Sequence, residues 1–193
     1  MEFIKDVTWK EVFGSWQKGE ASNPSWVELA TKVKGFPDWE SWRLATANDL
    51  KADEKEWRLF RFTDPFNEIP QMLVGPYSGW QSRLPEKNKY SFEELIEIPE
   101  QYEFFSQHSG VMSLMDSLPF STTMIGLRCE DSGGIVCIDG HHRATAMAII
   151  KKQAKKIDFS SVAIDIFIAD LPKDEIKLLD EIVKKKTKSD YQN

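Results

Sequence analysis

Apolar residues recur every three to four positions through the first fifty residues, which is the spacing typical of amphipathic helices. Thr8 is suited to cap a first helix, whose apolar face would hold Trp9, Val12, Phe13 and Trp16. A second helix is expected from Trp26 to Lys34, and a third after Asp38. Five of the seven tryptophans lie before residue 43. Two interpretations of them stay open: they join a helical layer to the rest of the protein, or they form a stacking platform for a base or another aromatic ligand.

The spacing of the apolar residues changes in the middle of the chain. Residues 57–62, Trp-Arg-Leu-Phe-Arg-Phe, alternate and predict a strand. A long segment punctuated by proline and glycine follows from Asp64 to Trp80, and a loop of this length inside a compact chain is usually functional or flexible. Ser91, with Glu94 three positions later, predicts a capped helix. Further short helices are expected over residues 101–106 and 111–118.

From residue 120 onward the pattern predicts β-structure around one helix. Residues 122–129 and 135–138 form a predicted hairpin across an Asp-Ser-Gly-Gly turn. A helix is expected from about His141 to Lys155, an alternating strand over residues 161–169, and a last helix after Pro172. The sequence therefore predicts an α+β fold: a small mixed sheet with a strand-turn-helix unit and a helical, tryptophan-rich N-terminal cover. We expect residues 1–56 to form that helical extension, packed on a core domain of residues 57–193.

Composition narrows the classes of protein. The 193 residues carry a net charge of -6, which argues against a broad basic surface that binds nucleic acid. The N-terminal residues lack a signal pattern, and no apolar run approaches the roughly 20 residues that span a bilayer. Cys129 and Cys137 are best interpreted as reduced thiols. We therefore expect a cytoplasmic protein with no membrane association.

The sharpest chemical signal is the turn Asp139-Gly140-His141-His142-Arg143 between a predicted strand and a predicted helix. The glycine permits an unusual backbone angle and a close ligand approach. The first N–H groups of the helix are unpaired and carry partial positive charge, which favours an anion. The arginine can grip phosphate oxygens, and both histidines add donors. This combination predicts a phosphate site.

Asp139 is unusual at a pure anion site, because its carboxylate repels phosphate. It fits if it orients a histidine, holds Mg²⁺ through water or accepts a proton. The alternative is a simple helix cap followed by solvated residues. A zinc site is less favoured, because adjacent helical histidines point about 100° apart and neither cysteine has a partner at C-x-x-C spacing.

The unit from Phe120 to Leu171, about a quarter of the chain, resembles the ParB/sulfiredoxin superfamily. Gly140, His141, His142 and Arg143 match the positions of G-C-H-R in sulfiredoxins and G-E-R-R in ParB partition proteins. A histidine stands at the sulfiredoxin nucleophile position, so the thiol chemistry is lost. Partition proteins also need a helix-turn-helix after this unit, and too little chain follows it here.

The motif D-G-H-H-R is most similar to the corresponding turn of the free serine kinases of that superfamily. The resemblance implies phosphoryl transfer from ATP or ADP, with Mg²⁺, to a small hydroxyl compound. It also implies that the turn holds the phosphates while an acid from an earlier loop acts on the substrate hydroxyl. Glu68 is the first candidate for that acid by chain order, Asp64 the second, and Asp139 the rival. Arg83 is either a second phosphate clamp or a surface residue.

Two other functions stay open at this point. One is a non-catalytic nucleotide-binding or switching module of the ParB-like type. The other is a ParB-like nuclease, which the negative net charge and the lack of an evident acidic metal cluster disfavour. A kinase needs a carboxylate facing the phosphate end of the turn, whereas a nuclease needs a basic groove beside it.

Overall fold

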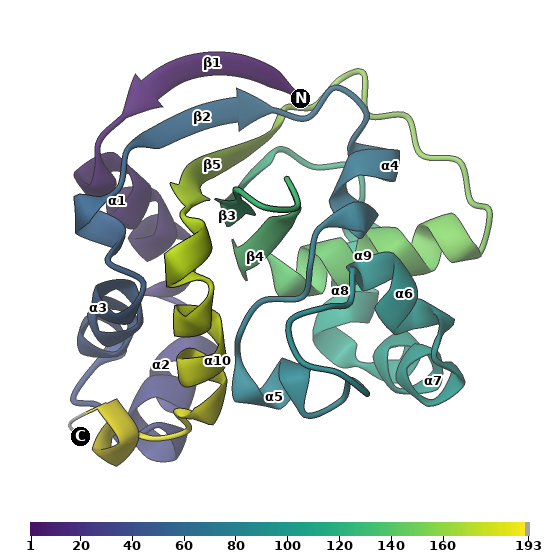
Figure 1. Cartoon of the computed structure of the whole chain (residues 1–193). Helices are drawn as coiled ribbons and strands as arrows, with labels where there is room; N and C mark the ends of the chain where they lie inside the picture. The colour runs from purple at the N-terminus through teal and green to yellow at the C-terminus, as the bar shows by residue number, and fades with distance from the viewer. Residues whose placement is uncertain (192–193) are drawn as a thin grey trace.

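The computed structural model describes residues 1–191. Within them, five strands form one mixed sheet in the order β1-β2-β5-β3-β4 (Figure 1). The strands are β1 (Glu2–Val7), β2 (Trp57–Arg61), β3 (Thr122–Cys129), β4 (Ile135–Asp139) and β5 (Ile164–Leu171). The pair β3 and β5 is parallel, and the other neighbouring pairs are antiparallel. The expected α+β class and the mixed sheet are therefore confirmed.

One face of the sheet is covered by the N-terminal helices and by the last helix. These are α1 (Trp9–Glu20), α2 (Pro24–Glu28), which continues as a π-helical turn (Leu29–Val33), α3 (Trp39–Asp49) and α10 (Lys177–Lys184). Thr8 caps α1 in a capping box, and Asp38 caps α3, as the sequence predicts. Their apolar side chains form one core with the sheet residues Ile125, Leu127, Phe167 and Ala169.

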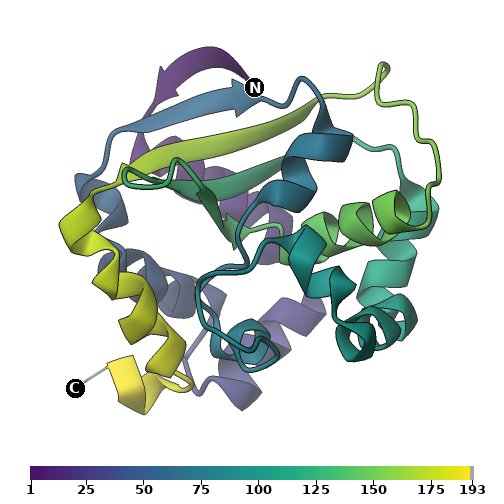
Figure 2. The same ribbon diagram turned by 45° about the vertical axis from the view of Figure 1, so that its right-hand side comes forward.

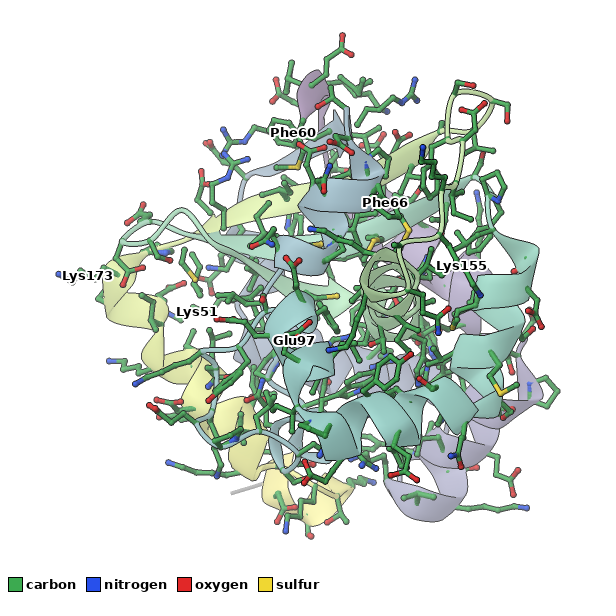
Figure 3. All side chains as sticks on the ribbon, turned by 90° about the vertical axis from the view of Figure 1, so that its right-hand side faces the viewer. Lys51, Phe60, Phe66, Glu97, Lys155 and Lys173 are labelled. Carbon is green, nitrogen blue, oxygen red and sulfur yellow. The ribbon has the colours of Figure 1, made fainter. Side chains whose placement is uncertain are left out.

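The opposite face packs against a second group of helices (Figure 2). The remaining helices are α4 (Pro65–Glu68), α5 (Ser78–Gln81), α6 (Phe92–Glu97), α7 (Pro99–Gln107), α8 (Ser109–Ser117) and α9 (His141–Lys152). Short 3₁₀ turns cover Ala52–Glu54, Ile69–Gln71, Lys173–Glu175 and Lys188–Tyr191. The predicted capping box of Ser91 and Glu94 starts α6. α4, which contains Phe66, and α6, which ends at Glu97, both pack against α9 (Figure 3). Lys155 lies just after the end of α9.

Three elements differ from the prediction. Residues 1–56 are not wholly helical, because β1 pairs with β2 at the sheet edge; its side chains are mostly exposed, so it shows little apolar alternation. The second helix changes to a π-helical turn at Leu29. The segment after Asp64 is not a plain loop, since it contains α4 and α5.

The predicted strand-turn-helix unit is confirmed. β3 and β4 form the expected hairpin, and α9 begins at His141 directly after Gly140. Cys129 and Cys137 are both buried free thiols, as expected. Within residues 1–191, no helix is both long and apolar enough to cross a membrane.

Candidate functional site

The turn after β4 presents an uncapped helix end. Gly140 has a φ of +114°, which other residues adopt only with strain, and a Cβ at this position would also lie 2.4 Å from the Cε of Met124. Within the described chain, no side chain caps α9, and the first backbone bond of the helix runs from Ala144 N to Gly140 O. The N–H groups of the first turn are thus available to an anion.

This helix end lies in a cavity of about 610 Å³ between the N-terminal helices and the turn. That volume falls within the range of small-molecule sites, roughly 300–1,000 Å³. Residues 138–143 form one part of the lining, and residues 77–80 form another. The N-terminal layer contributes a third part, consisting of Ser15, Trp16, Gly19, Glu20, Asn23, Trp26, Leu29, Lys34, Trp42 and Arg43. Sequence reasoning predicted the turn, whereas only the fold brings the three parts together.

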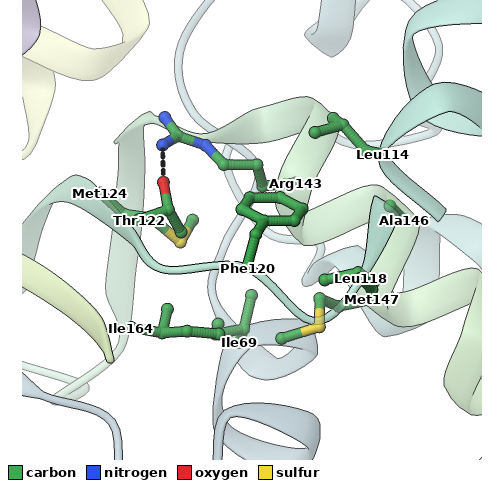
Figure 4. Close-up of a pocket in the computed structure, with 10 residues that line it drawn as sticks. All are labelled: Ile69, Leu114, Leu118, Phe120, Thr122, Met124, Arg143, Ala146, Met147 and Ile164. Atoms are coloured by element: carbon green, nitrogen blue, oxygen red, sulfur yellow. Dashed lines mark hydrogen bonds between the residues drawn. The ribbon is translucent and has the colours of Figure 1, made fainter. Parts of the chain in front are cut away.

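Arg143 is already engaged inside the protein. Its guanidinium donates to the Thr122 hydroxyl (Figure 4). It also donates to the Thr123 carbonyl oxygen and forms an ion pair with Asp139. Nε and one Nη2 hydrogen have no hydrogen-bond partner among the described residues. Because Arg143 lines the cavity, these donors can serve a ligand. Asp139 therefore orients Arg143, which explains a carboxylate beside an anion site.

His141 has a structural contact that the sequence did not predict. Its Nε2 accepts a hydrogen bond of 3.0 Å from the backbone N–H of Gly75, so the neutral ring carries its proton on Nδ1. Burial, followed by the charge of nearby cationic groups, holds the pKa of His141 well below its ordinary value. The side chain thus ties the segment around Gly75 to the turn, and the backbone N–H of His141 is the group left for a ligand.

His142 lies on the cavity lining in a neutral state. Burial, the neighbouring His108 and the charge of Arg143 lower the pKa of His142 to about 4. Its ring stacks on His108 at a centroid distance of 4.9 Å and tilts against Trp80 at 5.3 Å. At neutral pH it can therefore donate a hydrogen bond but adds no positive charge.

Replacing Gly75 by alanine should lower the free energy of unfolding by about 2–3 kcal/mol. This value is the sum of two costs, one from overpacking and one from the loss of a buried hydrogen bond. A Cβ here would lie 1.9 Å from the Cys137 carbonyl oxygen and 2.5 Å from Nε2 of His141. Urea unfolding measures the loss. Gly14→Ala in α1 is the matched control, since no atom lies within 4 Å of its Cβ. Equal stability of the two variants would rule out the Gly75–His141 contact.

Glu20 and Arg43 form a buried ion pair at the cavity, and no sequence signal pointed to either. Nε and Nη2 of Arg43 donate to the Glu20 carboxylate at 2.6–2.9 Å, and Nε1 of Trp39 donates to it at 2.7 Å. The exposed fractions of the Arg43 and Glu20 side chains are 5% and 7%. Burial raises the pKa of Glu20, Arg43 counters part of that rise, and Asp139 adds to it. The two carboxylates therefore interact with each other through the site.

The cavity is locally basic in an acidic protein. Two lysines, Lys34 and Lys185, line it together with Arg43 and Arg143. The described lining residues also include two carboxylates, Glu20 and Asp139. Burial and the charge of Arg43 lower the pKa of Lys34, while Lys185 pairs with Asp49 at 2.7 Å. Arg43, Arg143 and Lys185 are each paired with a carboxylate, so the positive charge of the lining that favours an anionic ligand comes mainly from Lys34.

The earlier acids do not reach this cavity. Glu68 accepts from the amino group of Met1 at 2.6 Å and from the backbone N–H of Asp64, and it lies outside the lining. Asp64 caps α4. Arg83 is also outside the lining, with its guanidinium 3.6 Å from the ring centroid of Phe104. The segment after β2 does reach the turn, but through Gly75 and Tyr77, whose hydroxyl donates to the Ile138 carbonyl oxygen.

A magnesium ion would have few protein ligands here. Among residues 1–191, no group of three or more histidine, cysteine, aspartate or glutamate side chains is placed to hold a metal. The Asp139 carboxylate has one oxygen not bonded to Arg143. Mg²⁺ in nucleotide sites is commonly held by one or two carboxylates and by the phosphates themselves. The described residues thus provide no dedicated magnesium site, and an ion that arrived with a nucleotide would be held mainly by its phosphates.

Comparison of the chain with protein-family models, with curated proteins and with solved structures finds no match.

Proposed function

We propose that the protein binds a nucleotide in this cavity and transfers its terminal phosphoryl group to a small hydroxyl compound. The observation that carries the proposal is the uncapped start of α9, which opens into a cavity lined by four cations and two carboxylates in the described chain. Phosphoryl transfer depends mainly on positioning and on charge neutralisation, and helix N–H groups with Arg143 supply both. The resemblance of the turn to the free serine kinases supports the same reaction.

In this proposal Asp139 is the general base. One carboxylate oxygen holds Arg143, and the other accepts the proton of the acceptor hydroxyl. The hydroxyl oxygen then forms a bond to the terminal phosphorus, and the bond from that phosphorus to the nucleotide breaks. The shortened nucleotide leaves with the electron pair of the broken bond. Mg²⁺, bound with the nucleotide, supplies charge neutralisation on the phosphates.

A nucleotide should raise the melting temperature of the protein. Binding at 100 times Kd stabilises by about 2.7 kcal/mol, which corresponds to a shift of roughly 5–10 °C for a chain of this size. Differential scanning fluorimetry with ATP and ADP, with and without Mg²⁺, measures the shift. No shift with any nucleotide at millimolar concentration would exclude the proposed function.

Arg143→Ala should weaken nucleotide binding by about 1.5–3 kcal/mol, the value typical of hydrogen bonds to charged groups. Because Arg143 also bonds to Thr122 and Thr123, we expect some loss of stability, so calorimetry should be run well below the melting temperature. Arg83→Ala is the matched control and should leave the affinity unchanged, since Arg83 lies outside the cavity lining. Unchanged affinity in Arg143→Ala would remove this residue from the site.

A second candidate is a nucleotide-binding module without catalysis. One specific observation favours it: both carboxylates that line the cavity in the described chain, Glu20 and Asp139, are already paired with arginines. Such a module would show the nucleotide-induced melting shift but no phosphoryl transfer to any hydroxyl compound.

A further inference from the structure

Among the described residues, four tryptophans line the cavity. Trp80 belongs to α5, and the other three come from the N-terminal helices and are called the tryptophan wall: Trp16 of α1, Trp26 of α2 and Trp42 of α3. Trp16 and Trp42 are buried, whereas Trp26 is only partly buried. The ring centroids of Trp26 and Trp42 are 6.3 Å apart. Because Arg43 lies over the rings of Trp16 and Trp42, Trp26 is the member of the wall that is most accessible to a ligand.

The wall residues also pack in the core: Trp16 and Trp42 belong to it, and Trp26 packs against it. Trp9, Trp39 and Trp57 join the helical layer to the sheet, and they lie outside the cavity lining. Trp9 and Trp57 contact each other at 5.5 Å within that core. The tryptophans of this core thus differ in their access to the cavity, since Trp16, Trp26 and Trp42 line it and Trp9, Trp39 and Trp57 do not.

Arg43 gives a second, independent indication of a ligand. Its guanidinium carbon lies 3.9 Å from the ring centroid of Trp42 and 4.7 Å from that of Trp16. Only 4% of the residue is exposed, and no hydrogen bond joins its Nη1 to a residue that the structure describes. Nη1 is not among the fully buried atoms that lack a partner, so it is a donor that a ligand in the cavity can use.

The charge of the site indicates what kind of acceptor this is. The Glu20 carboxylate binds Arg43 through two nitrogens, so the pair needs no second anion. A neutral acceptor at the edge of a flat ring can accept from Nη1 while the ring lies against Trp26. A second phosphate would satisfy only Nη1, and it would lie against apolar rings at the cost of its hydration.

We infer that the tryptophan wall binds the base of the nucleotide, with a ring nitrogen or a carbonyl oxygen of the base accepting from Nη1 of Arg43. The inference rests on the proposed function, in which the phosphates occupy the start of α9. A nucleoside diphosphate fits the cavity volume of about 610 Å³. The two ends of the ligand are thus recognised by different parts of the chain.

The test compares ligands that share the phosphates but differ in the base. Isothermal titration with ADP, GDP, UDP and inorganic pyrophosphate, all with Mg²⁺, gives four dissociation constants. We expect at least one nucleotide to bind about 10- to 100-fold more tightly than pyrophosphate, as stacking of one base predicts. The same nucleotide should quench tryptophan fluorescence, and pyrophosphate should not, which tests the inference without any variant.

Trp26→Leu should remove most of the nucleotide advantage and leave pyrophosphate affinity unchanged. Trp9→Leu is the matched control, because Trp9 is equally partly buried but packs on Trp57 away from the cavity. Pyrophosphate binding as tightly as every nucleotide would overturn the inference and leave the phosphate site standing. A nucleotide advantage that survives Trp26→Leu would also overturn it. If neither nucleotides nor pyrophosphate bind, the proposed function fails, and the inference fails with it.

Discussion

Arg43→Ala should lower the free energy of unfolding by about 3–5 kcal/mol, the usual cost of removing one partner of a buried ion pair. The Glu20 carboxylate would stay buried without its cation, and the cluster of indole rings would lose the guanidinium packed among them. Urea unfolding at pH 7 measures this loss. A loss below about 1 kcal/mol would mean that water reaches the pair.

The destabilisation of Arg43→Ala should also depend on pH. Burial already raises the pKa of Glu20, and removing Arg43 raises it further. A carboxyl whose pKa is higher in the folded state binds more protons there, so folding loses stability as the pH rises from the unfolded pKa through the folded one. The variant should therefore be closer to the wild type at pH 4 than at pH 7.

The matched control for this prediction is Arg61→Ala. Arg61 pairs with Asp165 on the surface of the sheet, and 46% of its side chain is exposed. Exposed ion pairs contribute about 0–1 kcal/mol, because water screens them. The contrast between the two arginines tests burial rather than the number of hydrogen bonds, since both bind their carboxylate through two nitrogens.

Asp139→Asn should slow phosphoryl transfer by roughly 10²–10⁴-fold, the usual share of general-base catalysis, while nucleotide affinity stays within a few-fold. The asparagine side-chain oxygen can still accept from Arg143, so the turn keeps its shape. A panel of small hydroxyl compounds, assayed for nucleotide-dependent phosphorylation, supplies the substrate. The rate constant and the dissociation constant are then measured separately.

Glu68→Gln is the matched control for the base. Glu68 pairs with the amino group of Met1 and lies outside the cavity lining, so this variant should transfer at the full rate. If the two phenotypes were exchanged, the segment of α4 would have to move onto the turn during the reaction. If neither variant changed the rate, Asp139 would serve only to orient Arg143.

The sequence by itself determined the elements and the turn. Local signals are sufficient there: Thr8 and Ser91 cap helices through bonds to residues three positions away, and Gly140 is required by a positive φ at its own position. The hairpin of β3 and β4 needs only a short turn between two apolar runs. These features depend on neighbours along the chain, so the sequence shows them directly.

The edge strand β1, and the layer that covers each face of β5, were harder to predict. β1 gains its backbone partners from β2, fifty residues away, and its exposed side chains carry no apolar pattern. In β5, Ile164, Ile166 and Ile168 pack in one core, while Phe167 and Ala169 pack in the other. Apolar residues at successive positions identify the strand, but only the tertiary structure assigns a helical layer to each face.

Only the tertiary structure decided the composition of the cavity. Glu20 of α1 and Arg43 of α3 form an ion pair between the two helices. Both line the same cavity as Asp139, because the N-terminal layer packs beside the turn. Chain order favoured Glu68 as the acid, yet the fold places it against Met1. Contacts between distant segments depend on how the layers pack, and no local spacing encodes that packing. The sequence therefore located the turn before α9, and the packing of the layers determined which side chains surround it.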